Sequence, residues 1–300
     1  MRTFIFPGQG SQTKGMGADL FDRFAPLTDI ADSILGYSLR RLCLDDPDDR
    51  LNDTEFAQPA LYVVNALCYL DKLDERGPEP DFVAGHSLGE FNALLAANSF
   101  DFETGLRLVK RRGKLMACAT GGAMAAILNT SETEVRSILE REDLTAVDIA
   151  NYNTPSQIVI SGRTEDIEAA RQAFHDGLHL FVPLKTSGAF HSHYMAQARA
   201  EFAEFLERVP LAEPTIPVIS NVTARPYQRT TIKKLLTRQI SSPVRWTETI
   251  DYLARYPGME FEEIGWGTTL TKLVRKIRRE AREPARTSDP RPAASTPADR

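Results

Sequence analysis

The sequence predicts an α/β fold with an open, mostly parallel sheet and a small inserted unit. Strands alternate with helices along most of the chain, which is typical of a parallel sheet. One central stretch instead has the order β-α-β-β-α-β, the split-βαβ arrangement of a ferredoxin-like subdomain. The chain has 300 residues, of which 42% are hydrophobic and 26% charged, so one large and one small globular unit fit its length.

The first predicted elements lead into two loops. Residues 3–6 are a short apolar run before Pro7-Gly8-Gln9-Gly10, which indicates a strand that ends in a tight loop. Residues 82–84 indicate a short buried strand, followed by a turn at Ser87. Apolar residues at helical spacing predict helices at residues 58–73, 89–98 and 102–119.

The inserted unit is predicted to span residues 122–186. Ser131 or Thr130 could cap its first helix. Its strands are expected at residues 123–128, 147–150, 157–161 and 180–184, its helices at 131–141 and 164–174, and a turn at 153–156.

The larger domain is predicted to comprise residues 1–121 and 187–282. Residues 283–300 are rich in Pro, Ala, Ser, Thr and Arg without apolar periodicity, so we expect a disordered tail or linker there. After the insertion we expect helices at residues 195–208, 231–240, 246–255 and 269–281 and strands at 216–220 and 260–264.

The composition argues against several classes of protein. A net charge of -5 and a pI near 5.7 do not suit a nucleic-acid partner. No apolar run approaches the length of a membrane span. The apolar run at residues 3–6 is too short for a signal peptide. Cys43, Cys68 and Cys118 lack metal-ligand spacing and are expected to be buried, reduced thiols, which predicts a cytoplasmic location.

Ser87 lies in Gly85-His86-Ser87-Leu88-Gly89, the G-x-S-x-G pattern of a nucleophile elbow. The turn between strand and helix is sharp, so side chains at Gly85 and Gly89 would collide with neighbouring backbone. The elbow would hold the serine hydroxyl at the positive end of the following helix. The alternative is a glycine-rich connection with an incidental serine.

A serine nucleophile needs a base, and the chain has five histidines. His191 and His193 follow a predicted strand of the larger domain, where α/β folds place their sites. His191 is the better candidate, although spacing alone does not choose it over His193, and a structural helix-capping histidine is the alternative. His175 and His179 are a weak metal pair, and we expect no metal site.

Arg112 lies in a basic segment of a predicted helix. If it reached the pocket, it would bind a substrate carboxylate through two parallel hydrogen bonds. For the neighbouring Lys110, Arg111 and Lys114, a solvated helix face is the expected arrangement.

Five segments together resemble the malonyl-CoA:acyl carrier protein transacylases. The resemblance covers about residues 1–282 and is greatest to the discrete acyltransferases that serve polyketide synthases in trans. The segments are Phe6-Pro7-Gly8-Gln9-Gly10-Ser11-Gln12, Gly85-His86-Ser87-Leu88-Gly89-Glu90, Arg111-Arg112-Gly113-Lys114, Gly188-Ala189-Phe190-His191-Ser192 and Ser220-Asn221-Val222-Thr223-Ala224.

The resemblance implies an α/β-hydrolase-like domain with an inserted ferredoxin-like subdomain, and it implies a role for each matching residue. Ser87 would be acylated, and His191 would be the general base and acid. The backbone amides of Gln9 and Leu88 would form the oxyanion hole, and Arg112 would bind the malonyl carboxylate. The backbone carbonyl of Gln239 would orient the histidine. Asn153 and Asn151 match a segment near the site.

Phe190 bears on the choice of acyl group. Relatives that select malonyl units commonly have Phe before the histidine, because a bulky ring leaves little room for an α-methyl group. A single methyl group is worth only about 1–3 kcal/mol, so the resemblance implies a preference for malonyl. Trp266 departs from the family pattern and could line the pocket, meet the carrier or simply pack.

The expected function is transfer of malonyl from malonyl-CoA, through Ser87, to the phosphopantetheine thiol of an acyl carrier protein in polyketide or fatty acid biosynthesis. The partners are malonyl-CoA and the carrier protein, and no cofactor is implied. The first alternative is an acyl hydrolase that clears carrier proteins, for which Arg112 would be unnecessary. The second is a non-catalytic docking module, which would not need an intact Ser87 and His191.

Overall fold

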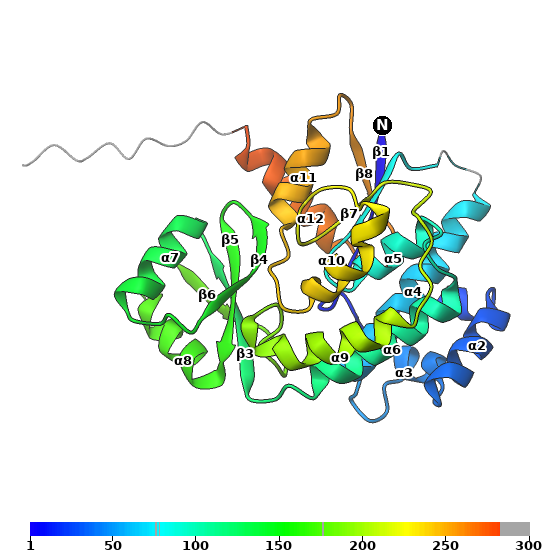
Figure 1. The fold of residues 1–300 in the computed structure, drawn as a ribbon, viewed down its shortest axis with the longest axis horizontal. Helices are drawn as coiled ribbons and strands as arrows, with labels where there is room; N and C mark the ends of the chain where they lie inside the picture. The colour runs from blue at the N-terminus through cyan, green and yellow to red at the C-terminus, as the bar shows by residue number, and fades with distance from the viewer. Residues whose placement is uncertain (76, 78, 176, 283–300) are drawn as a thin grey trace, which may run out of the picture.

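The computed structural model describes residues 1–75, 77, 79–175 and 177–282. The chain forms a large lobe and a small lobe, each built on its own four-stranded sheet (Figure 1). The predicted α/β class with a parallel sheet is confirmed.

The sheet of the large lobe is parallel throughout and has the strand order β7-β2-β1-β8. Successive residues of a strand point to opposite faces, and here Phe4 and Phe6 enter one apolar cluster while Ile5 enters the other. Both faces of the sheet are therefore covered by helices, as parallel sheets require. The strands are β1 (Arg2–Phe6), β2 (Phe82–Gly85), β7 (Val218–Ile219) and β8 (Glu260–Glu263).

Helices α4 to α6 and α9 pack on one face of this sheet, and α11 and α12 pack on the other. Helices α1 to α3 were not predicted. The helices are α1 (Ala18–Phe21), α2 (Ala25–Leu35), α3 (Leu39–Leu44), α4 (Thr54–Asp74), α5 (Gly89–Ala96), α6 (Phe102–Ala117), α9 (Ala196–Glu207), α10 (Ile232–Gln239), α11 (Trp246–Ala254) and α12 (Thr269–Glu280).

The small lobe has an antiparallel sheet in the order β4-β5-β3-β6, and a separate apolar cluster lies between this sheet and helices α7 and α8. The Ser131 hydroxyl caps α7 by accepting from the Glu134 amide. The elements are β3 (Gly122–Leu128), α7 (Glu132–Arg141), β4 (Asp148–Thr154), β5 (Gln157–Arg163), α8 (Thr164–Ala173) and β6 (Leu180–Pro183).

The prediction that a turn begins at Asn153 was wrong, because β4 continues to Thr154. The Tyr152 amide donates to the Val244 carbonyl oxygen at 2.9 Å, and the Val244 amide donates to the Ala150 carbonyl oxygen at 2.9 Å. This pairing joins the small lobe to the large one, and a single-sequence pattern contains no signal for it. The strand reaches Thr154 because that residue pairs with Gln157 of β5.

The prediction of three buried thiols was also wrong in part. Cys43 is buried and Cys68 partly buried, but Cys118 is exposed. Cys118 immediately follows α6, at the connection to the small lobe, where the apolar helix face has ended.

Candidate active site

Ser87 lies on the turn between β2 and α5, with a positive φ of 51°. A Cβ on Gly85 would lie 1.9 Å from the Gly89 carbonyl carbon, and one on Gly89 would lie 2.0 Å from the Phe6 carbonyl oxygen. Both positions therefore require glycine, because neighbouring backbone atoms leave no room for a side chain. The turn holds Ser87 in a left-handed conformation that a non-glycine residue adopts only when its surroundings impose it.

The His191 ring lies between the Ser87 hydroxyl and two backbone carbonyls. Its Nε2 is 2.8 Å from Ser87 Oγ, and its Nδ1 is 2.8 Å from the Gln239 carbonyl oxygen and 3.2 Å from that of Ser242. Since a carbonyl oxygen can only accept, Nδ1 carries the proton and Nε2 is free to accept from Ser87.

The His191 imidazole is neutral at neutral pH. Burial, together with the nearby Arg112 charge, lowers the pKa of His191 to about 3. A neutral imidazole that accepts from a serine hydroxyl can take up the proton when that hydroxyl becomes a nucleophile.

The structure separates His191 from the other histidines that the sequence left open. His193 is exposed, and its Nδ1 lies 2.7 Å from Asp148 Oδ2. His86 points from the Ser87 turn toward the small lobe, where its Nε2 donates to Asn153 Oδ1 at 2.9 Å. Asn153 thus reaches the same pocket, but through His86 rather than through Ser87.

Arg112 comes from α6 and is buried, with 1% of its surface exposed. Its guanidinium donates to Ser87 Oγ at 3.1 Å, to Gln58 Oε1 at 2.6 Å and to Gln239 Oε1 at 2.8 Å. Burial lowers the pKa of Arg112 to about 10, and the Glu90 charge opposes this shift, so the group is cationic at neutral pH. A buried cation therefore lies within hydrogen-bond distance of the serine hydroxyl.

Two backbone amides flank the Ser87 turn without an internal partner. In the described part of the chain, no hydrogen-bond acceptor is found for the backbone N–H of Gln9 or of Leu88. The two loops are in close contact, because a Cβ on Gly8 would lie 2.2 Å from the His86 carbonyl oxygen and 3.5 Å from the Leu88 nitrogen. Such free donors can stabilise a negative oxygen.

A cavity of about 450 Å³ between the lobes contains Ser87, His191 and Arg112 in its lining. Phe190 lines it as well, is 4% exposed, and packs its ring on Gly188, where a Cβ would lie 2.8 Å from the ring. The cavity has room for a small acyl group, and the Phe190 ring occupies part of its wall.

Sequence reasoning assigned no role to Glu90, Asn221 or Gln58, although Glu90 and Asn221 stand in quoted motifs. Asn221 Oδ1 accepts from the Ser87 amide at 2.7 Å, and its Nδ2 donates to the Gly85 carbonyl oxygen at 2.7 Å. Glu90 is buried and contacts both Asn221 and Gln239. The available signal for Glu90 was a single charged residue in the mostly apolar helical segment directly after the elbow.

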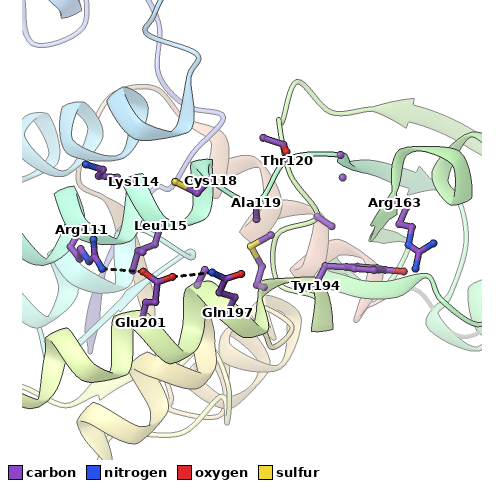
Figure 2. A pocket seen from close by; sticks show the side chains of 15 residues that line it. Arg111, Lys114, Leu115, Cys118, Ala119, Thr120, Arg163, Tyr194, Gln197 and Glu201 are labelled. Carbon is purple, nitrogen blue, oxygen red and sulfur yellow. Dashed lines mark hydrogen bonds and ion pairs between the residues drawn. The ribbon is translucent and has the colours of Figure 1, made fainter.

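A second cavity, of about 670 Å³, lies between α6, α9 and the small lobe. Figure 2 shows Glu201 between Arg111 and Gln197, with Cys118 nearby. Arg111 pairs with Glu201 at 3.2 Å, so it is not simply solvated, and none of the residues around the Ser87 hydroxyl lines this cavity.

Trp266 packs against the core of the large lobe, and its Nε1 donates to Thr13 Oγ1 at 2.9 Å. It does not line the cavity that contains Ser87. Of the interpretations that the sequence left open, packing is the one that these contacts support.

Neither a membrane-crossing helix nor a cluster of three or more metal-ligating side chains is found among the described residues.

A serine hydroxyl, a neutral imidazole held by a backbone carbonyl, and free amides beside the turn are the arrangement of enzymes that transfer acyl groups through a serine ester. A model of the acyl transferase domain family matches residues 3–287, and the chain belongs to this family.

The chain is 53% identical, over 94% of its length and 98% of the relative, to a polyketide biosynthesis malonyl CoA-acyl carrier protein transacylase from Bacillus subtilis. It is 55% identical to a solved malonyl CoA-acyl carrier protein transacylase from Burkholderia pseudomallei, with a TM-score of 0.92, covering 95% of this chain and 99% of that one. A malonyl-transacylase solved in complex with its type II polyketide synthase acyl carrier protein is 35% identical, with a TM-score of 0.88 and 93% of both chains covered.

Proposed function

We propose that this chain is a malonyl-CoA:acyl carrier protein transacylase of polyketide biosynthesis that works through a malonyl ester of Ser87. The observation that carries the proposal is the Arg112 guanidinium, which lies 3.1 Å from Ser87 Oγ inside the protein. A buried cation next to the nucleophile suits an acyl group that carries its own carboxylate. The names of the relatives from polyketide pathways support the pathway.

In the first half-reaction, Ser87 Oγ attacks the thioester carbonyl carbon of malonyl-CoA while its proton passes to His191 Nε2, 2.8 Å away. The negative oxygen that develops is stabilised by the amides of Gln9 and Leu88. The C–S bond then breaks, the coenzyme A sulfur takes the proton from His191, and malonyl-O-serine remains.

In the second half-reaction, the phosphopantetheine thiol of an acyl carrier protein gives its proton to His191 and attacks the ester. The Ser87 oxygen leaves and recovers the proton, so the enzyme ends as it began. The Gln239 carbonyl oxygen keeps His191 in the required tautomer throughout, in place of the acid of a Ser-His-Asp triad. No step needs a metal or a redox cofactor.

Arg112 seats the malonyl carboxylate in this proposal, and Phe190 limits what the α-carbon can carry. The Phe190 ring is buried against Gly188 and has little freedom to withdraw. An α-methyl group would have to displace it, at a cost of about 1–3 kcal/mol. The site therefore prefers malonyl to methylmalonyl, and Asn153 completes the pocket from the small lobe through its contact with His86.

We further propose that residues 1–121 and 187–282 form an α/β-hydrolase-like domain and residues 122–186 a ferredoxin-like subdomain. The antiparallel order β4-β5-β3-β6 of a βαββαβ unit and the separate apolar core of the small lobe support this division. The predicted tail at residues 283–300 lies outside the described residues, and the cytoplasmic location stays a prediction.

Intact-mass analysis tests the function. The chain is mixed with malonyl-, methylmalonyl- or acetyl-CoA, with and without a phosphopantetheinylated carrier protein. We expect a malonyl adduct on the chain that moves to the carrier when the carrier is added. Rapid loss of the adduct to water, with no transfer, would instead support an acyl hydrolase.

Arg112→Ala is expected to weaken malonyl loading selectively. The carboxylate loses its cationic partner, so the malonyl loading rate should fall about 10- to 100-fold, as hydrogen bonds to charged groups contribute about 1.5–3 kcal/mol. Acetyl loading should fall much less. The measurement is the ratio of malonyl to acetyl adduct formation over time.

Arg111→Ala is the matched control, because this neighbouring arginine pairs with Glu201 outside the site. It should leave the malonyl-to-acetyl ratio as in the wild type. Equal losses of malonyl and acetyl loading in Arg112→Ala would contradict the role of Arg112.

A further inference from the structure

Glu90 is a buried carboxylate on the first turn of α5, with none of its surface exposed. One of its oxygens accepts from the Asn221 amide at 3.1 Å and from the Tyr227 hydroxyl. The other accepts from Gln239 Nε2 at 2.6 Å. An ionised carboxylate is tolerated inside a protein only when it is compensated in this way, so its presence needs a reason.

Asn221 is the first connection between Glu90 and the serine turn. Its backbone is held by Glu90, while its side chain accepts from the Ser87 amide and donates to the Gly85 carbonyl oxygen, both at 2.7 Å. Asn221 therefore links Gly85, where the turn begins, to Ser87, the residue of the turn with a positive φ. Without these two side-chain hydrogen bonds, the strained turn has fewer contacts that hold Ser87 in place.

Gln239 is the second connection. Its Nε2 donates both to Glu90 and, at 2.8 Å, to the Ser87 carbonyl oxygen, while its Oε1 accepts from Arg112 at 2.8 Å. The carboxylate on one side and the guanidinium on the other thus select one orientation of the amide. With the opposite orientation, the Gln239 NH2 would face Arg112 and its oxygen would face Glu90.

We propose that Glu90 is a positioning residue for acyl transfer, whose negative charge orients Gln239 and Asn221 and thereby holds Arg112 and the Ser87 turn in the reactive geometry. The proposal rests on the proposed function of Ser87. It assigns Glu90 no contact with the substrate.

The electrostatic surroundings of Glu90 are simple. In the described part of the chain, the charged and titratable groups that face it are Arg112 from α6 and Tyr227 from the loop after β7. Burial raises the pKa of Glu90 to about 7, against the hydrogen bonds from Tyr227 and Gln239, which lower it. His191 has its pKa at about 3, so a rise in rate with pH near 7 is expected from Glu90 rather than from His191.

The test is Glu90→Gln, which keeps the size of the side chain and removes its charge. Rates of malonyl-serine formation are measured from pH 5 to 9 and normalised to the final amount of adduct, so that misfolded protein does not count. We expect an acylation rate about 10- to 100-fold below wild type at high pH, as for a displaced reactive group. The rise near pH 7 should be absent in this variant.

Thr28→Val is the matched control, since it removes a buried side-chain hydrogen bond from α2, outside the site. It should keep the wild-type rate and pH profile. Tyr227→Phe is a milder second variant: it leaves the carboxylate in place and removes a hydrogen bond that lowers its pKa. It should move the rise in rate to higher pH, and it decides the matter if Glu90→Gln does not fold.

Three outcomes overturn the inference while the wild type still forms a malonyl ester. The first is an acylation rate for Glu90→Gln within about threefold of wild type. The second is a loss of acylation rate in Thr28→Val equal to that in Glu90→Gln. The third is a pH profile that is unchanged in both Glu90→Gln and Tyr227→Phe. A wild-type chain that takes no malonyl group overturns the proposed function itself.

Discussion

Ser87→Ala is expected to abolish formation of the malonyl adduct. The change removes only Oγ, which is the atom that bonds to His191 Nε2 and accepts from Arg112. Removing the nucleophile of a serine enzyme costs about a million-fold in turnover, because no neighbouring group can form the ester. Intact-mass analysis with malonyl-CoA should therefore show unmodified protein, and the carrier protein should receive no malonyl group.

The fold should survive this substitution. Alanine has the same Cβ as serine, so the strain at a φ of 51° is unchanged, and the backbone bonds to Asn221 and Gln239 remain. Ser99→Ala is the matched control, because this serine is buried in the loop between α5 and α6, away from the pocket. It should load malonyl like the wild type. An adduct on the Ser87→Ala variant would show that another residue is the nucleophile.

His191→Ala is expected to slow malonyl-ester formation by about 10²- to 10⁴-fold, because Ser87 loses the base that takes its proton. The Gln239 and Ser242 carbonyl oxygens that held Nδ1 would then face an empty space. Added imidazole should fill this space and restore part of the rate. The measurement is the rate of adduct formation with and without imidazole.

His193→Ala is the control for this experiment, as it lies two positions along the chain and pairs with Asp148 at the surface. We expect a rate close to wild type and no response to imidazole. Similar losses in the two variants would mean that the segment is needed for folding rather than for proton transfer.

Much of the fold follows from local patterns in the sequence. The alternation of strands and helices predicted the parallel sheet, and the central element order predicted the small lobe, because both depend on the apolar periodicity of short segments. The end of β4 did not follow, because Thr154 still pairs with Gln157 of β5 and the middle of β4 pairs with Val244 of the other lobe. Helices α1 to α3 were missed. The four-residue α1 and the six-residue α3 carry too few turns for a periodic signal, but the 11-residue α2 was missed as well.

The sequence by itself determined the Ser87 turn, since close backbone approach at Gly85 and Gly89 admits little except glycine. It also supplied His191 and Arg112 as candidates by residue type and, through family resemblance, their expected roles. Residue spacing alone could not choose His191 over His193, and no sequence pattern revealed the part of Glu90. Only the tertiary structure decided these points, because Ser87 meets His191 across 104 positions and Arg112 meets Gln239 across 127, and burial, which sets their charges, exists only in the folded chain.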